Sequence, residues 1–384
     1  MKRLSFQRVF ICFVSIGLLA LYLSVWLSFA GNSDAKRSDF MIYYTAGRLP
    51  LSKLYNIDAQ REVENSTLGA PFPVEGRLLP FNHTPIFVPL LHLLVNEDYA
   101  SSYLRWTALL WFTALACAFL IFRMTGDVAL TFAAASFYPL FTLVQQAHDA
   151  VFMLLGILLG AHLLSLRKDF LAGIALSLAT VKPHFAIFLA VPLIAKPKAF
   201  LGFCLASALL ALYSVLLVGI GGVSEFIGLL KISVKGDGFG MRPMFMFNLL
   251  GLMERAGLSP DVARPVAWTA FFVTAISLLV IWKRNPLKPP LALAIVLAVF
   301  TSPHLYRHDL ALLLASFATL SKPHALLLLG SSLALAVLNI SGSKWQFAAA
   351  YTLMGVLIAM SIREFRRQAP QLDKVGTYGV VSNQ

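Results

Sequence analysis

Long apolar runs, each ended by a short polar stretch, dominate the chain. The first covers residues 9–30 and is long enough to cross a bilayer, which takes about 20 residues. A shorter run, 85–95, cannot cross alone and is interpreted as re-entrant or interfacial. The other apolar runs predict helices at 100–122, 128–144, 150–166, 170–181, 183–195, 199–220, 264–282, 291–302, 310–320, 325–341 and 346–362. The pattern predicts an all-α polytopic integral membrane protein of about ten to thirteen transmembrane helices.

Two pairs of these predicted helices are separated only by polar connections that contain proline. Lys182 and Pro183 interrupt the first pair, 170–181 and 183–195, and a segment that begins at Ser302 interrupts the second, 291–302 and 310–320. Polar, non-helical backbone at membrane depth is tolerated only where protein or a water-filled cavity covers it. Both connections are therefore expected to be covered in this way.

The distribution of basic residues predicts the orientation. Lys2, Arg3 and Arg8 precede the first helix, which we interpret as an uncleaved anchor because a signal peptide would have a shorter apolar core. With alternating sides, sixteen basic and four acidic residues fall on the cytoplasmic side, net +12, and fifteen and fourteen fall outside, net +1. Positive residues concentrate on the cytoplasmic side of membrane proteins. Both termini are therefore predicted to be cytoplasmic.

Composition excludes several classes of protein. Hydrophobic residues make up 58% of the chain and charged residues only 13%, whereas about 25% is usual in soluble domains. A soluble enzyme, a disordered chain and a nucleic-acid-binding module are thus excluded, although the net charge is +13. Cys12, Cys117 and Cys204 all lie in apolar runs, so neither a disulfide framework nor a cysteine metal cluster is expected.

The predicted organisation is a single transmembrane domain, 1–362, followed by a cytoplasmic tail, 363–384. Two long outer loops, 31–84 and 221–264, interrupt the domain. The first loop contains apolar pieces at 40–44 and 51–54, which suit helices that lie on the membrane surface.

Ionisable residues collect at the predicted outer rim of the apolar segments. Such residues are costly there and indicate a functional site. Each has a structural alternative, since Asp149 could pair with His148 and Arg307 with Asp309. The occurrence of these residues together at one rim indicates a functional site more specifically than any one of them does alone. The candidate site residues are Asp39, His83, Gln146, His148, Asp149, Lys182, His184, His304, Arg307, His308 and Asp309.

These residue types suit a reaction between an anionic lipid and a hydroxyl group. Lys182 and Arg307, assisted by His304 and His308, are predicted to bind a phosphate. Asp39 or Asp149 could act as general base toward the hydroxyl. Asp39 could instead be a helix N-cap, because it precedes an apolar stretch. Few carboxylates have metal-ligand spacing, so neither a metal nor a cofactor is expected.

The motifs that carry this interpretation also resemble glycosyltransferase family 87, membrane enzymes of the GT-C class. They are spread from about residue 9 to residue 320. This chain has Gln145-Gln146 where the family more often has Gly-Gln, and His83 where an aromatic residue is usual. The similar segments are Ser38 to Arg48, Leu54-Tyr55, Phe81 to Phe87, Gln146 with Asp149, Ala172-Gly173 leading to Lys182-Pro183, and Ser302-Pro303 followed by Arg307-His308-Asp309.

The resemblance implies a GT-C fold and a transferase that moves a monosaccharide, commonly mannose, from a polyprenyl-phosphate donor to a lipid or glycan acceptor. It implies action at the outer face of a bacterial inner membrane, with inversion at the anomeric carbon and Asp39 at the position of the catalytic base. A lipid-linked polymer ligase or acyltransferase remains an alternative. A secondary transporter is another, although two similar halves and charges at the midplane, which are usual there, are not seen.

Overall fold

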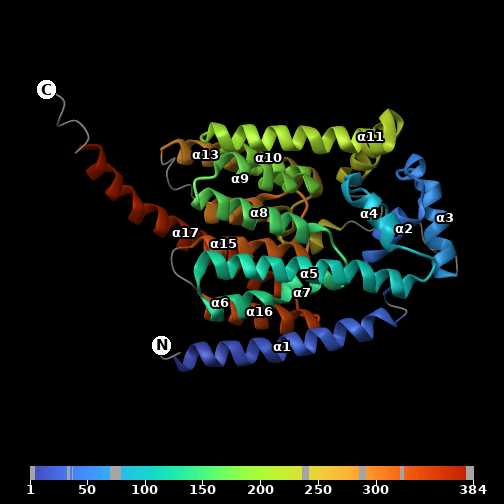
Figure 1. The fold of residues 1–384 in the computed structure, drawn as a ribbon, viewed down its shortest axis with the longest axis horizontal. Helices are drawn as coiled ribbons and strands as arrows, with labels where there is room; N and C mark the ends of the chain where they lie inside the picture. Colours follow the sequence, from blue (N-terminus) through green and yellow to red (C-terminus); the bar gives the residue numbers. More distant parts are fainter. Residues whose placement is uncertain are drawn as a thin grey trace.

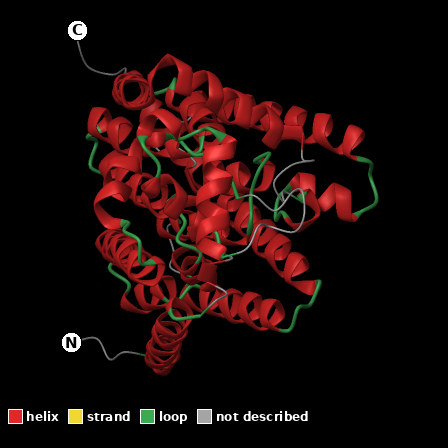
Figure 2. Ribbon diagram, turned by 90° about the vertical axis from the view of Figure 1, so that its right-hand side faces the viewer, coloured by secondary structure: helices red, strands yellow, loops and turns green. Residues whose placement is uncertain are grey.

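The computed structural model describes residues 5–32, 35, 36, 38–69, 79–235, 242–284, 291–320 and 324–377, and all regular elements in these ranges are helical (Figures 1 and 2). The α-helices are α1 (Phe6–Ala30), α2 (Phe40–Arg48), α3 (Ile57–Leu68), α4 (Val88–Leu94), α5 (Tyr99–Thr125), α6 (Val128–Ala135), α7 (Tyr138–Gln145), α8 (Ala150–Ser165), α9 (Asp169–Leu176), α10 (Pro183–Leu193), α11 (Pro197–Lys235), α12 (Leu249–Arg255), α13 (Pro260–Arg284), α14 (Leu291–Thr301), α15 (Leu313–Thr319), α16 (Ala325–Ile340) and α17 (Trp345–Thr377). Short 3-10 helices are η2 (Leu51–Lys53), η3 (Pro85–Phe87), η4 (Ser177–Val181), η5 (Pro243–Phe245) and η6 (Arg307–Leu312).

The all-α prediction is confirmed for the described residues, but the predicted number of membrane crossings is not. By length and composition, six segments in these ranges could cross a membrane: Phe6–Ala30, Tyr99–Thr125, Val128–Gln145, Pro197–Ile232, Pro260–Lys283 and Trp345–Arg366. Other apolar helices, such as α8 and α14, are shorter, with 10–17 residues. Large apolar side chains on α1 and α11 face outward, as expected of helices that contact lipid; Phe13, Leu216 and Ile220 are examples.

The long helices lie lengthwise, and the short helices α2, α3 and α4 gather at one end of the molecule (Figure 1). Helix α1 begins and α17 ends at the opposite end, which agrees with the prediction that the two termini share one side. Which side of a membrane each end faces stays a prediction. Lys2, Arg3, Lys288 and Lys322, which were counted as cytoplasmic, lie outside the described residues.

The apolar segment 128–145 is interrupted between α6 and α7, and a side chain of α16 forms hydrogen bonds with the backbone groups at the interruption. Pro139 lies in the first turn of α7, where its missing N–H costs nothing. Ser332 of α16 accepts a hydrogen bond from the Tyr138 backbone N–H at 2.8 Å and donates one to the Ser136 carbonyl at 3.0 Å. A buried interruption of this kind is stable because neighbouring helices bind the freed backbone groups.

Glycine allows α9 to lie directly against α11. A Cβ atom added to Gly173 would lie 1.9 Å from the Ala199 carbonyl oxygen, and one added to Gly202 would lie 2.1 Å from the Phe170 carbonyl oxygen. No other residue permits this approach of two backbones. The contact fixes α9 and the η4 turn that follows it, and η4 leads directly to Lys182.

Both predicted outer loops differ from expectation. Helix α2 is buried within the protein along Phe40–Ala46, so the prediction that this piece lies on the membrane surface is wrong. Helix α11 continues to Lys235, so residues 221–235 are helical rather than loop. Gly219 takes a φ of 69° there, which glycine adopts without strain, and allows the helix to kink and continue. At the other end, α17 runs past Arg363 to Thr377, and residues 378–384 of the predicted tail lie outside the described residues.

Candidate functional site

Two adjoining cavities lie among the connections that were predicted to form a site. The Asp39 cavity, of about 470 Å³, is lined by Asp39, His83, Gln146, His148, His304, Tyr306, Arg307, His308 and others. The Lys182 cavity, of about 210 Å³, is lined by Lys182, His184, Arg264, Trp268 and others. Asn82, His83, His148 and His304 belong to both linings, so these side chains form the shared wall. Asp149 and Asp309 lie buried behind them, which brings all eleven predicted residues together.

Asp39 occupies the N-cap position of α2 but does not cap it. Its side chain makes no capping hydrogen bond, and its backbone is already helical, with φ −61° and ψ −14°. The neighbouring Ser38 hydroxyl accepts from the Phe40 N–H at 3.3 Å instead. The capping explanation for Asp39 therefore fails on geometry, and its carboxylate is left to face the cavity.

The surroundings of Asp39 favour proton transfer. Its backbone N–H donates to Gln146 Oε1 at 3.4 Å, and its carboxylate Oδ2 lies 4.0 Å from His308 Nδ1. Burial raises the pKa of Asp39 above its usual value, while His148, His83 and Lys182 act in the opposite direction. About a third of the side chain, 34%, stays exposed, so the carboxylate can meet a substrate. A carboxylate with a raised pKa next to a cavity is typical of a general base.

A strained turn places His148 and Asp149. Ala147 between α7 and α8 has a φ of 62°, which is costly for any residue with a Cβ, and its carbonyl accepts from Trp106 Nε1 at 2.8 Å. Beyond this turn, Asp149 lies between two imidazoles: Oδ2 is 3.2 Å from His83 Nδ1, and Oδ1 is 3.3 Å from His148 Nδ1. Burial acts to raise the pKa of Asp149, but the two histidines outweigh it and hold the pKa well below its usual value.

Lys182 and Asp309 form a buried ion pair that joins the two polar connections predicted from the sequence. Lys182 Nζ contacts Asp309 Oδ1, and the side chains are only 7% and 0% exposed. Asp309 Oδ2 also accepts from the Tyr306 N–H at 3.1 Å. Burial acts to raise the pKa of Asp309, but Lys182 and its neighbours lower it below the usual value. The alternative in which Arg307 pairs with Asp309 is therefore wrong.

Arg307 is half-buried and has no acidic partner within 4.0 Å among the described residues. It lines the same cavity as Asp39, so it offers a positive charge there that no carboxylate neutralises. Burial lowers the pKa of His304 to about 4 and that of His308 well below its usual value. Both imidazoles are therefore neutral near neutral pH and can assist an anion by hydrogen bonds rather than by charge.

Several buried polar atoms of the site have no hydrogen-bond partner. They are Asp149 Oδ1, His184 Nε2, Arg307 Nε and His308 Nε2. An unsatisfied buried polar atom costs about 1–3 kcal/mol, so a cluster of four points to a ligand that satisfies them. Two triads could also supply metal ligands: His83, His148 and Asp149, and His148, His308 and Asp309.

Sequence reasoning missed several residues of the site, among them Asn82 of the shared wall. The Tyr43 hydroxyl accepts from the Asp149 N–H at 3.1 Å and lies 3.4 Å from His148 Nδ1. Tyr306 lines the Asp39 cavity, and Arg264 of α13 lines the Lys182 cavity. The aromatic residues beside Asp39 and His308 were a usable signal for Tyr43 and Tyr306, whereas Arg264 stood at the end of a predicted loop with no polar neighbours in sequence.

An apolar groove of about 470 Å³ adjoins the Lys182 cavity. It lies mainly between α10 and α11, and Pro183 belongs to both linings. Aliphatic and aromatic side chains such as Ile187, Val215 and Phe226 dominate it. The Lys182 cavity and the apolar groove therefore meet at Pro183.

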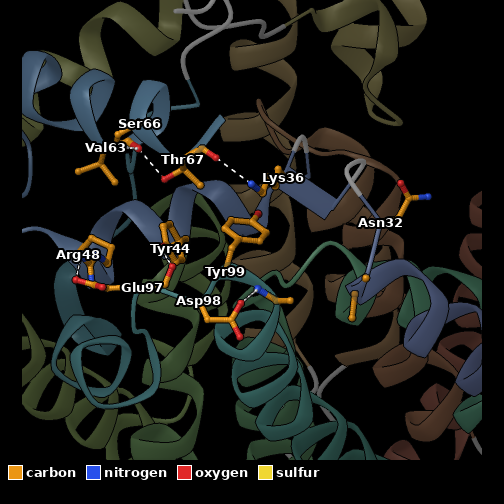
Figure 3. A pocket seen from close by; sticks show the side chains of 13 residues that line it. Asn32, Lys36, Tyr44, Arg48, Val63, Ser66, Thr67, Glu97, Asp98 and Tyr99 are labelled. Carbon is orange, nitrogen blue, oxygen red and sulfur yellow. Dashed lines mark hydrogen bonds and ion pairs between the residues drawn. The ribbon is translucent and has the colours of Figure 1, made fainter. Parts of the chain in front are cut away.

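A separate polar hollow of about 600 Å³ is lined by residues of α2, α3 and the start of α5 (Figure 3). Its charged groups are already engaged: Lys36 donates to the Thr67 carbonyl at 3.1 Å, and Arg48 lies 3.6 Å from Glu97. Asp98 caps α5 through the Ala100 N–H. This hollow shares no lining residue with the Asp39 cavity, so we do not place the reaction there.

Comparison with known proteins identifies the family. No curated protein and no solved structure matches the chain. A family model, by contrast, matches residues 81–305. This region contains the shared histidine wall, Asp149 and Lys182, whereas Asp39 and Arg307 lie outside it. It covers more than half of the sequence, and the chain belongs to glycosyltransferase family 87.

Proposed function

We propose that this chain transfers a monosaccharide, such as mannose, from a polyprenyl-phosphate donor to a hydroxyl of a lipid or glycan acceptor, with Asp39 as the general base. The observation that carries the proposal is the Asp39 carboxylate: it caps no backbone group and faces a cavity that shares its histidine wall with the Lys182 cavity, which in turn adjoins an apolar groove at Pro183. The protein would work as a GT-C enzyme at the outer face of a bacterial inner membrane.

The order of the three spaces fits a lipid-linked donor. An isoprenoid chain would lie in the groove between α10 and α11, which is almost entirely apolar. Its phosphate would then reach the polar side of Pro183, where Lys182, Arg264 and the shared histidines line the next cavity. The sugar would extend past the histidine wall toward Asp39, and Arg307 would reach the phosphate from that side of the wall. Each part of the donor meets surroundings of its own polarity.

The proposed step is a single displacement. Asp39 removes the proton of the acceptor hydroxyl while that oxygen forms a bond to the anomeric carbon. The bond from the anomeric carbon to the phosphate oxygen breaks, and the polyprenyl phosphate leaves with the electron pair. Attack opposite the leaving group inverts the anomeric configuration. Arg307, with the remaining N–H groups of Lys182, stabilises the negative charge on the phosphate.

The test is an assay with radiolabelled polyprenyl-phosphate sugar and the purified protein in lipid. Wild type should move label into a lipid or glycan product, and Asp39→Asn should lower this rate by about 10²–10⁴-fold because Asn cannot accept the proton. Asp58→Asn is the matched control, since Asp58 in α3 is 88% exposed and pairs with Arg61 at 3.1 Å, away from both cavities.

Three outcomes would contradict the proposal. Wild-type turnover in a well-folded Asp39→Asn protein would remove Asp39 as base and leave Asp149 as the next candidate. Uptake of label into sealed vesicles without product would instead indicate a transporter. In right-side-out vesicles, failure to use an acceptor that cannot cross the membrane would contradict the outer-face location.

A further inference from the structure

We propose that His83, His148 and Asp149 form a binding site for a divalent transition-metal ion of the zinc class. The three side chains are buried or nearly so, and each offers one ligand atom within 4.8 Å of the other two. This proposal departs from the metal independence expected from the sequence, and it concerns ion binding by this chain whether or not the donor is the one proposed above.

Each imidazole lies beside one oxygen of Asp149. Oδ2 lies 3.2 Å from His83 Nδ1, and Oδ1 lies 3.3 Å from His148 Nδ1. With metal–ligand bonds of about 2.0–2.1 Å, ligand atoms of a tetrahedral site lie about 3.3 Å apart. Because the two contacts use different oxygens, the carboxylate and the imidazoles would have to rotate to bring one oxygen and both ring nitrogens to one ion; the three ligand atoms already lie within 4.8 Å of one another.

An unsatisfied atom points to a ligand at this place. Asp149 Oδ1 is buried and has no hydrogen-bond partner, although His148 Nδ1 is near it. The Asp149 side chain is 3% exposed, so water cannot readily compensate the oxygen. A cation bound between the carboxylate and the imidazoles would satisfy it directly.

Charge in the site does not oppose a cation. Asp39, Asp149 and Asp309 supply three carboxylates to the described part of the site, against Lys182, Arg264 and Arg307. With neutral imidazoles the sum of these six groups is 0. A dication would change it to +2 and make the cavities more favourable to an anion.

The donor set selects the type of metal. Two imidazole nitrogens and one carboxylate oxygen suit Zn²⁺ and related transition metals, whereas Ca²⁺ and Mg²⁺ prefer oxygen ligands. His83 and His148 belong to the wall shared by both cavities, so the remaining coordination positions are accessible to water or an anionic oxygen. The other triad is less suitable because Lys182 already pairs with Asp309.

Metal titration of the purified full chain tests this site without any sugar donor. After removal of metals by a chelator, wild type should bind one Zn²⁺ per chain in calorimetry, and Co²⁺ should give the absorption bands of a tetrahedral site. His83→Ala and Asp149→Asn should each weaken Zn²⁺ binding by at least about 100-fold, since even outer-shell partners contribute 10–100-fold. His92→Ala is the control, because His92 is an exposed histidine of α4 outside the cluster.

The outcomes separate this site from the catalytic proposal. Zn²⁺ binding that fails in both ligand variants and persists in His92→Ala supports the site even if no sugar transfer is found. No binding to wild type, equal binding to all variants, or equal affinity for Mg²⁺ would overturn it. Asp149→Asn keeps the shape of the side chain, and its thermal unfolding in the absence of metal shows whether weak binding reflects lost folding.

Discussion

The Asp39 side and the Lys182 side of the cleft hold their carboxylates in opposite ways. Asp39 is 34% exposed, caps no backbone group and lies 4.0 Å from the nearest imidazole nitrogen. Asp309 is fully buried, pairs with Lys182 and accepts from the Tyr306 N–H. The first arrangement leaves a carboxylate free to exchange a proton, whereas the second uses one to hold two chain connections together. Under the proposed function, the same residue type therefore serves chemistry on one side of the cleft and stability on the other.

The largest expected effect comes from breaking the buried ion pair. Lys182→Met leaves the Asp309 carboxylate buried without a cation and should cost about 3–5 kcal/mol of folding stability. The double variant Lys182→Met with Asp309→Asn should recover most of this loss because it removes the unpaired charge. Thermal unfolding of the purified protein measures both effects.

Arg61→Met is the control for this comparison. Arg61 pairs with the exposed Asp58, and exposed pairs contribute only about 0.2–1 kcal/mol. A Lys182→Met protein as stable as Arg61→Met would show that the pair does not hold the two connections together.

A smaller effect is expected on donor binding when Arg307 loses its charge. Arg307 lines the Asp39 cavity without an acidic partner within 4.0 Å among the described residues, so Arg307→Gln removes a cation that is available to the phosphate. A loss of about 2 kcal/mol, or roughly 30-fold in donor affinity, is expected because the side chain is half-buried. Donor KM at fixed acceptor concentration measures it.

Arg264→Gln provides the matched comparison for Arg307. Arg264 lines the Lys182 cavity rather than the Asp39 cavity. If Arg264→Gln weakens donor binding and Arg307→Gln does not, the phosphate lies out of reach of Arg307, and the assignment of Arg307 to the phosphate is wrong.

The helices were largely predictable from the sequence because apolar runs and prolines mark where they begin and end. The predicted pair 170–181 and 183–195 corresponds to α9 with η4, and to α10. The extension of α11 past Gly219 was not predictable, since a kinked helix and a loop have similar local patterns there. Likewise, Phe40–Ala46 is apolar enough for a membrane surface, and only the packing around α2 shows that it is buried.

The sequence predicted which ionisable residues belong to the site, but it did not predict which of them pair with one another. Rim position alone identified Lys182, Arg307 and Asp309. The partner of Asp309 depends on how two connections that are 127 residues apart meet, and the sequence neighbour Arg307 was the wrong choice. The His83 and Asp149 contact spans 66 residues, so spacing along the chain could not reveal a metal triad.

The smallest expected effect is a shift in the pH dependence of sugar transfer, which tests whether Asp39 is the proton-accepting carboxylate. Burial raises the pKa of Asp39, so its carboxylate becomes protonated at a higher pH than the usual value of about 3.9. Only the ionised form can act as base, so the transfer rate should fall on the acid side at a pH above that value. The groups that face Asp39 and affect this limb are His83, His148, Lys182, Tyr306, Arg307, His308 and Asp309.

The contribution of Asp39 to folding stability should depend on pH in the opposite direction to the transfer rate. A carboxyl with a raised pKa stabilises the fold below its unfolded pKa, and this contribution is lost as pH rises through the folded pKa. At neutral pH the ionised Asp39 therefore stabilises nothing by this route, and Asp39→Asn should be at least as stable as wild type. The pH profile of transfer by wild type and Asp39→Glu, together with unfolding of Asp39→Asn, measures both sides. An acid limb at the ordinary aspartate value, or one that Asp39→Glu leaves unmoved, would mean that another group titrates and that Asp39 is not the base.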